Sequence, residues 1–306
     1  MFLTLLLAHA ALAADTTFLG ALESVTEIED GDVAGEIQAE VDVAVSAGAF
    51  TADVQLDMKY DPFAGEFAPF LPEKASLAYA ADAWAIEGGM IVPALGLEGW
   101  DTWDNALPSF SNTFTYGSVG HMAGANASYN AGPGKVFAFG GIDLDRDTAV
   151  TGGGFTAETD VWSTWSGVAA WPTIETYAGF ANLSTTPVAW LGVAVDGSGG
   201  TVAKNPWATG QVVLTGLPDA TVHPLARVEA TWDPDHAALG EEALPLGLSL
   251  GAGAHIGWVH AALEGKLARR EEAFEPMGIF CLTVLGPPDH EGGEAHEGAA
   301  EAVPVH

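Results

Sequence analysis

Two neighbouring stretches of the chain, residues 36–45 and 51–61, alternate between apolar and polar side chains. In the first stretch, acidic or amide side chains stand between the apolar residues Ile37, Ala39, Val41, Val43 and Val45. A period of two over about ten residues is typical of a strand with one apolar and one polar face, as in a membrane barrel. The segment 46–49 between the stretches predicts a tight hairpin.

The pairing of this hairpin predicts which polar residues face one another. With a turn centred on residues 47 and 48, Asp42 would lie opposite Asp53, and Glu36 would lie opposite Lys59. Opposed carboxylates destabilise a dry surface, so this face must be in contact with water. Both the lumen of a barrel and the solvent face of a β-sandwich meet that condition.

The period of two recurs at 222–233, 246–255 and 259–268. Weaker candidate strands are 75–81, 83–92, 112–118, 122–130, 135–143, 156–170, 174–183, 187–196, 209–216 and 276–285. Turn-forming residues gather at 130–134, 196–200 and 217–219. With about 19 residues per strand and connection, the sequence predicts an all-β fold: a transmembrane antiparallel up-and-down β-barrel of about 14 strands, within a range of roughly 12 to 16.

Tryptophans lie mostly near the ends of the expected strands, which is typical of aromatic girdles at membrane interfaces. They are Trp84, Trp162, Trp165, Trp171, Trp190, Trp207, Trp232 and Trp258. Many positions on the polar faces hold Gly, Ala or Ser, which suits a wall with space inside. Ordinary core aromatics are the alternative interpretation.

Composition and charge exclude several classes of protein. Asp and Glu number 41 against 9 Lys and Arg, for a net charge of −32, so clustered phosphate contacts with nucleic acid are excluded. Hydrophobic residues make up 48% of the chain and mean hydropathy is +0.21, which excludes a disordered acidic chain. This apolar surface must be buried or lie in lipid, yet no apolar run after the first residues is long enough for a transmembrane helix.

The chain begins with the apolar run MFLTLLLAHAALAA, which predicts a signal peptide over residues 1–14. We expect an N-terminal segment of undetermined structure at 15–34, where 17–30 alone suggest a helical period. The barrel domain is expected at 35–285, followed by a disordered, acidic, His-containing tail at 286–306. The single cysteine, Cys281, excludes an internal disulfide.

Residues 87–143 show a loose motif in which a strand leads into an Asn/Ser-rich segment and then into two further strands. The motif residues are Gly89, Pro93, Gly96, Glu98, Asn105, Ser109 and Ser111. This fifth of the chain resembles the β-barrel porins of Gram-negative outer membranes that are called OmpL-like. The resemblance implies an outer-membrane barrel that passes small solutes, and it supplies no catalytic residues.

Acidic residues of the first two strands are the main candidates for a functional site: Glu36, Glu40, Asp42, Asp53 and Asp57. Acidic rings favour cations in a pore, because a low-dielectric wall focuses their field. The other residues expected to line the lumen are Lys59, His223, Arg227, Glu229, His255, His260, Glu264 and Lys266. The alternative is that the acids only keep a wet face soluble.

Two further patterns could bind metal. Asp143, Asp145 and Asp147 have the opening spacing of a calcium loop, but later positions break that pattern, which favours a solvated acidic turn. A hairpin turn between His255 and His260 would set these residues opposite each other, but a metal site needs a third ligand. We therefore expect no metal and no cofactor.

The sequence contains no G-x-S-x-G elbow and no H-E-x-x-H motif, and it predicts no enzyme. The leading hypothesis is a porin in outer-membrane lipid that passes small hydrophilic solutes by diffusion and prefers cations. The alternative is a secreted or surface β-sandwich that binds carbohydrate or protein through aromatic loops such as 100–104.

Overall fold

The computed structural model describes residues 15–29, 32–68, 71–93, 107, 119–218, 220–234, 238–239, 245–257, 259–270 and 273–285. Apart from a short 3-10 helix at Pro172–Ile174, the regular structure of these residues is antiparallel β-sheet. The strands are β1 (Asp15–Glu29), β2 (Asp32–Ala47), β3 (Phe50–Asp61), β4 (Glu66–Phe67), β5 (Leu71–Ala81), β6 (Trp84–Ile91), β7 (Met122–Ala131), β8 (Gly134–Asp143), β9 (Thr148–Glu158), β10 (Trp162–Trp171), β11 (Thr176–Val188), β12 (Leu191–Val202), β13 (Asn205–Gly216), β14 (Val222–Trp232), β15 (Leu246–Ile256), β16 (Val259–Arg270) and β17 (Ala273–Leu285).

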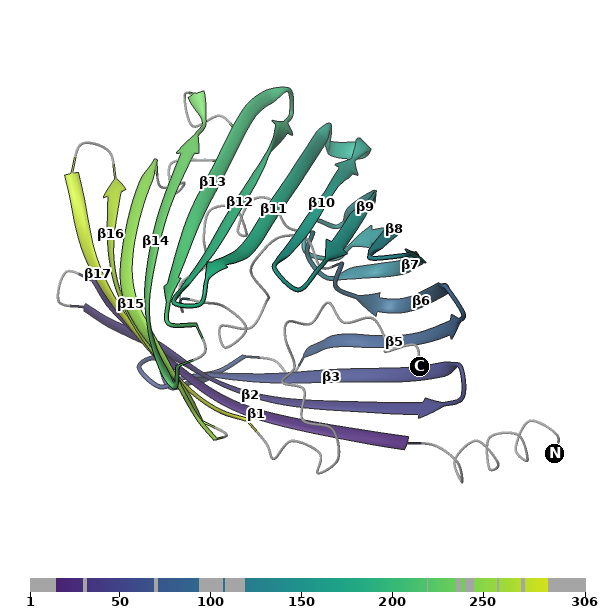
Figure 1. Ribbon diagram of the computed structural model, residues 1–306, viewed down its shortest axis with the longest axis horizontal. Helices are drawn as coiled ribbons and strands as arrows, with labels where there is room; N and C mark the ends of the chain where they lie inside the picture. The colour runs from purple at the N-terminus through teal and green to yellow at the C-terminus, as the bar shows by residue number, and fades with distance from the viewer. Residues whose placement is uncertain are drawn as a thin grey trace.

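The sheet closes on itself as a barrel, because β1 pairs with both β2 and β17 (Figure 1). The ring has 16 strands, since β3 pairs directly with β5 and the two-residue β4 only extends the edge of β3. When paired residues are followed from strand to strand once round the ring, the path returns to β1 about 20 residues further along that strand. This stagger corresponds to strands tilted by about 40° to the barrel axis. The predicted antiparallel barrel is confirmed at the upper end of its strand range, and the β-sandwich alternative is wrong.

The two faces of this wall have opposite polarity. Outward positions hold large apolar side chains that are strongly exposed, such as Leu250 at 61% and Leu263 at 59%. Alternate inward positions on the same sheet hold buried polar side chains, such as Gln211 and Glu264. A water-soluble protein has the reverse arrangement. Apolar outside and polar inside is the polarity of a membrane-spanning barrel.

Outward-facing aromatic rings gather near the end of the barrel where β1 begins: Phe50, Tyr79, Trp84, Tyr129, Trp162 and Trp190. Two pairs are in contact across strands, with ring centroids 4.9 Å and 4.6 Å apart. These rings form an aromatic girdle of the expected kind. Trp165, Trp171 and Trp207 face inward instead, which corrects the expectation that they belong to a girdle.

The connections differ between the two ends of the barrel. Those at the end where β1 begins are short, whereas 92–121 and 233–245 at the opposite end are long. Among the described residues, no helix is long and apolar enough to cross a membrane.

The barrel begins earlier than the sequence predicts. Residues 15–29, expected as a segment of undetermined structure, form strand β1. Its outward positions include Ser24 and Thr26, and these hydroxyls obscure the period of two.

Two other expectations need correction. The expected turn at 196–200 lies inside β12, where Asp196 and Ser198 face the interior. The expected single strand at 156–170 is two strands, the end of β9 and β10 as far as Ala170. The turn at 159–161 contains neither Gly nor Pro, so no turn signal separates the two strands in the sequence. The signal peptide, the expected strand at 112–118 and the tail lie outside the described residues.

Candidate functional site

An apolar cluster covers the inner face of the wall from β6 to β13. We call it the inner apolar cluster: Ile91, Val119, Met122, Phe139, Val150, Ala169, Trp171, Ala178, Phe180 and Trp207. Ala238 and Leu239, from the connection between β14 and β15, pack against it. These two connection residues therefore cover part of the inner apolar cluster.

A residue of the other long connection lies deep inside the barrel. Leu107 follows β6 and is only 2% exposed. A Cβ atom placed on Gly251 of β15 would be 2.8 Å from its Cδ2 atom, and β15 lies nearly opposite β6 in the ring. Leu107 therefore lies across the interior from β6, which the sequence did not predict.

Charged side chains line the inner face along β2, β3, β5 and β6. We define the acidic wall as Glu36, Glu40, Asp42, Asp53, Asp57 and Glu87. Lys59 Nζ lies 3.6 Å from Glu36, while Lys74 Nζ lies 2.7 Å from Asp53 and 3.5 Å from Glu87. These five side chains are 25–50% exposed, so solvent reaches this part of the interior. Glu87 and Lys74 were not expected from the sequence, although both occupy polar positions within apolar runs.

The register of the first hairpin differs from the expected one. Gly48 has a φ of 62°, a conformation that glycine adopts without strain, and it takes the first position of the turn. The pairing is consequently shifted by two residues, so that Gln55 lies opposite Asp42. An even shift keeps the same side chains facing inward. The directly opposed acids are instead Glu40 and Asp57.

The basic and acidic residues expected on β14 and β16 form two buried ion pairs. Arg227 Nη2 lies 3.2 Å from Glu264 Oε1, and Lys266 Nζ lies 2.9 Å from Glu229 Oε1. All four side chains are at most 6% exposed. They face the interior but are shielded from solvent, so they contribute structure rather than an exposed charge.

The three histidines expected in the lumen form a stack across β14, β15 and β16. His255 lies directly opposite His260, as the hairpin predicts, with ring centroids 4.3 Å apart and nearly parallel planes. His223 stacks on the other side of His255 at 5.6 Å. Parallel rings direct their nitrogen lone pairs along separate planes. Among the described residues, no group of three His, Cys, Asp or Glu side chains is arranged to hold a metal ion.

The acidic turn between β8 and β9 is occupied by internal contacts. Asp143 is fully buried, and its Oδ2 accepts hydrogen bonds from Trp171 Nε1 at 2.7 Å and from Arg146 Nη1 at 2.9 Å. Asp145 Oδ2 accepts the backbone N–H of His121 at 3.0 Å. Through the contact with His121, this turn holds the end of the connection between β6 and β7 in place. No contact of Asp147 with the described residues supports the calcium-loop interpretation.

Replacing Trp171 with phenylalanine tests this network. The change removes a hydrogen bond to a buried carboxylate, so we expect a loss of about 1.5–3 kcal/mol in the free energy of unfolding, measured by urea titration in lipid vesicles. Trp165→Phe is the matched control, because Trp165 also faces inward on β10 and its Nε1 donates to no described residue. Equal losses in the two variants would contradict the assigned role of Asp143.

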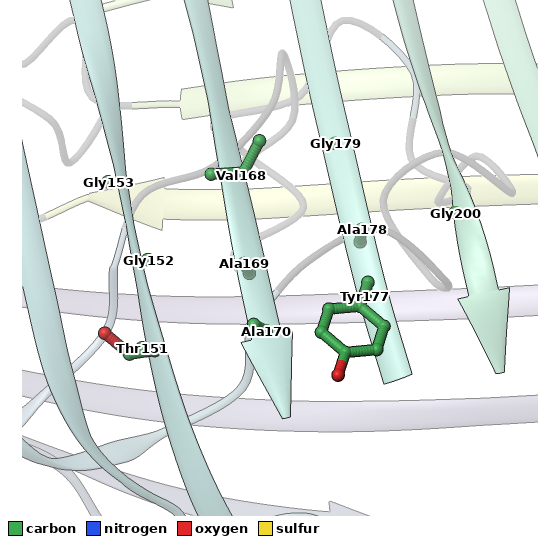
Figure 2. A pocket seen from close by; sticks show the side chains of 10 residues that line it. All are labelled: Thr151, Gly152, Gly153, Val168, Ala169, Ala170, Tyr177, Ala178, Gly179 and Gly200. Carbon is green, nitrogen blue, oxygen red and sulfur yellow. The ribbon is translucent and has the colours of Figure 1, made fainter. Parts of the chain in front are cut away.

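The outer wall carries a shallow groove over β9–β12. Figure 2 shows the side chains of Val168 and Tyr177 beside glycine residues. Because glycine has no side chain, the outer surface is recessed at these positions. The lining residues are Thr151, Gly152, Gly153, Val168, Ala169, Ala170, Tyr177, Ala178, Gly179 and Gly200. Gly and Ala dominate the groove, which suits contact with hydrocarbon and supplies no acid–base pair.

No protein-family model matches this chain, and no curated protein matches it. Solved structures do. OmpF of Salmonella typhi, in complex with daunomycin, is 10% identical, with a TM-score of 0.71 over 90% of this chain and 98% of that one. The chain has the porin fold. A Rhodopseudomonas blastica porin mutant is 12% identical, with a TM-score of 0.62 over 89% of this chain and all of that one. A loop-deleted OmpT of Vibrio cholerae is 13% identical, with a TM-score of 0.62 over 90% and 100% of the two chains.

Proposed function

We propose that this protein is an outer-membrane porin that lets small hydrophilic solutes diffuse passively and prefers cations. The observation that supports this most directly is the polarity of the closed barrel: an apolar outer face and an inner face with solvent-exposed charges. Lipid would cover the outer face and water would fill the exposed part of the interior. Residues 1–14 would direct export as a cleaved signal peptide.

The proposed path for solutes follows the acidic wall. The inner apolar cluster lies along β6–β13 and Leu107 lies against β15, whereas the ion-paired side chains of β2, β3, β5 and β6 are 25–50% exposed. A solute would cross by diffusion along these strands, with no chemical step. Of the residues expected to line the pore, we assign Lys59 and the five acids expected from the sequence to this path, and we add Glu87.

The proposed cation preference follows from the balance of charge. The acidic wall has six carboxylates, and the lysines paired with it are Lys59 and Lys74. An excess of fixed negative charge beside low-dielectric walls concentrates cations and repels anions. The buried pairs on β14 and β16 leave this excess unchanged, because each is neutral as a pair.

Swelling of proteoliposomes tests passive diffusion. We expect liposomes containing the folded protein to swell in uncharged sugars, at rates that rise linearly with concentration and fall with sugar size, because a water-filled path selects by size. Liposomes with heat-denatured protein are the control. Folded, membrane-inserted protein that causes no swelling even with the smallest sugar would refute the porin proposal.

A further inference from the structure

Three histidines from neighbouring strands form a compact stack at the end of the barrel where β1 begins. We call His223 of β14, His255 of β15 and His260 of β16 the histidine stack, in which the ring centroids of adjacent members lie 5.6 Å and 4.3 Å apart. Gly253 makes this packing possible, because a Cβ atom at that position would lie 2.5 Å from His223 Nε2. The glycine therefore gives the His223 ring room to approach His255.

The histidine stack lies in the same row of inward-facing side chains as part of the acidic wall. His260 is paired with Thr283 of β17, which is paired with Glu23 of β1. Glu23 is paired with Gln38 of β2, and Gln38 donates a hydrogen bond to Asp57 of the acidic wall at 2.6 Å. Three steps between neighbouring strands place His260 about 14 Å from Gln38. A charge on the stack therefore acts on ions beside the acidic wall, since low-dielectric walls focus its field.

The histidine stack has no acidic partner among the described residues. No acidic side chain there is in contact with the three rings, and the buried Nδ1 atoms of His223 and His260 form no hydrogen bond with the described residues. Within two inward-facing positions of the stack's row, the adjoining strands carry these charged or titratable side chains: Arg227, Glu264, Cys281, Glu23 and Glu27. Arg227 and Glu264 form an ion pair, while Glu23 accepts hydrogen bonds from Thr283 and Cys281.

The charge of the histidine stack depends on pH. Histidine is the side chain that gains its positive charge between about pH 8 and pH 5. At neutral pH the stacked rings are uncharged, since charged imidazoles with centroids 4.3 Å apart would repel each other. In acid, protons reach the stack through His255, which is exposed, whereas His260 is only 4% exposed. Acid therefore adds up to three positive charges to the interior.

We infer that the histidine stack sets the pH range in which the pore prefers cations. The six carboxylates of the acidic wall and its two lysines carry a net charge of −4, and three charged imidazoles would reduce the total to −1. Cation preference is therefore strong when the stack is neutral and weak when it is charged. This inference rests on the proposed pore and adds regulation of its selectivity by protons.

The test compares the K⁺/Cl⁻ permeability ratio of the wild-type protein with that of a triple variant, His223→Gln, His255→Gln and His260→Gln. Reversal potentials in planar bilayers under a KCl gradient give the ratio at about pH 7.5 and about pH 5. We expect the wild-type ratio to fall about twofold more than the triple-variant ratio, because glutamine gains no charge. Any decrease that the triple variant keeps belongs to protonation of carboxylates.

Two single variants complete the comparison. His121→Gln is the matched control, because His121 lies at the opposite end of the barrel beside Asp145, and its loss should leave the wild-type pH response unchanged. His255→Gln removes the exposed middle ring and should remove part of the response. It keeps the inference testable if the triple variant does not fold, which heat-dependent mobility on a gel shows.

A second measurement separates failure of the stack from failure of the pore. Acid should lower the unfolding temperature of the wild-type protein in detergent more than that of the triple variant, because the unfolded chain separates the rings and takes up protons more readily. If current flows and both proteins show the same pH response, the role of the stack is refuted and the pore stands. If no current flows, the pore and the selectivity role are both refuted, and the unfolding temperatures still show whether the stack responds to protons.

Discussion

Replacing Arg227 with methionine is expected to lower the free energy of unfolding by about 3–5 kcal/mol. The Arg227 and Glu264 side chains are 1% and 0% exposed, and their charged atoms lie 3.2 Å apart. Methionine keeps most of the volume but leaves the Glu264 carboxylate buried without this guanidinium. Urea titration of the protein in lipid vesicles, followed by tryptophan fluorescence, measures the loss.

Two further variants test the cause. Arg227→Met combined with Glu264→Leu removes both charges, so most of the lost stability should return. Lys59→Met is the control at an exposed pair, since Lys59 is 39% exposed, and we expect a loss below about 1 kcal/mol. A double variant as unstable as Arg227→Met alone would show that the cost does not come from the Glu264 carboxylate left without this guanidinium.

Neutralising Asp42 and Asp53 together as asparagines is expected to lower the K⁺/Cl⁻ permeability ratio by about threefold or more. A single charge at about 4 Å from an ion contributes about 1 kcal/mol even in bulk water. The loss of Asp53 also removes the nearer partner of Lys74, whose Nζ lies 2.7 Å from that carboxylate and 3.5 Å from Glu87, so its positive charge opposes cations more strongly. Reversal potentials in a KCl gradient measure the ratio.

The matched control for this variant is Asp160→Asn. Asp160 is exposed in the turn between β9 and β10, away from the acidic wall, and its loss should leave the ratio unchanged. Heat-dependent mobility on a gel verifies that each variant is folded. A folded double variant with the wild-type permeability ratio would rule out the acidic wall as the source of selectivity.

The sequence predicts strands accurately where large apolar residues alternate with charges. The expected strand at 222–233 is β14, and the expected strand at 259–268 lies within β16, because Val, Leu, Arg and Glu separate the two faces clearly. Where both faces carry small residues, the alternation of apolar and polar side chains no longer identifies a strand. Residues 196–200 combine Asp, Gly and Ser, which favour turns locally, yet pairing with β11 and β13 holds them in a strand.

The arrangement of the interior was harder to predict, since it depends on contacts between distant segments. Period-two alternation identifies which residues face inward, but it does not show that Leu107 crosses to β15 or that Leu239 packs on the opposite wall. A signal was present in the inward aromatic positions of β8 and β10, such as Phe139 and Trp171. Large apolar side chains facing a wet lumen indicate that another segment covers them.

The measurement that tests the central claim most directly is the reversal potential of the wild-type protein in a planar bilayer under a KCl gradient. We expect a stable conductance with a potential of the sign that K⁺ gives as the main carrier. A potential of the opposite sign would keep the pore and contradict the role of the acidic wall. The absence of any conductance from protein shown to be folded and inserted would contradict the open pore itself.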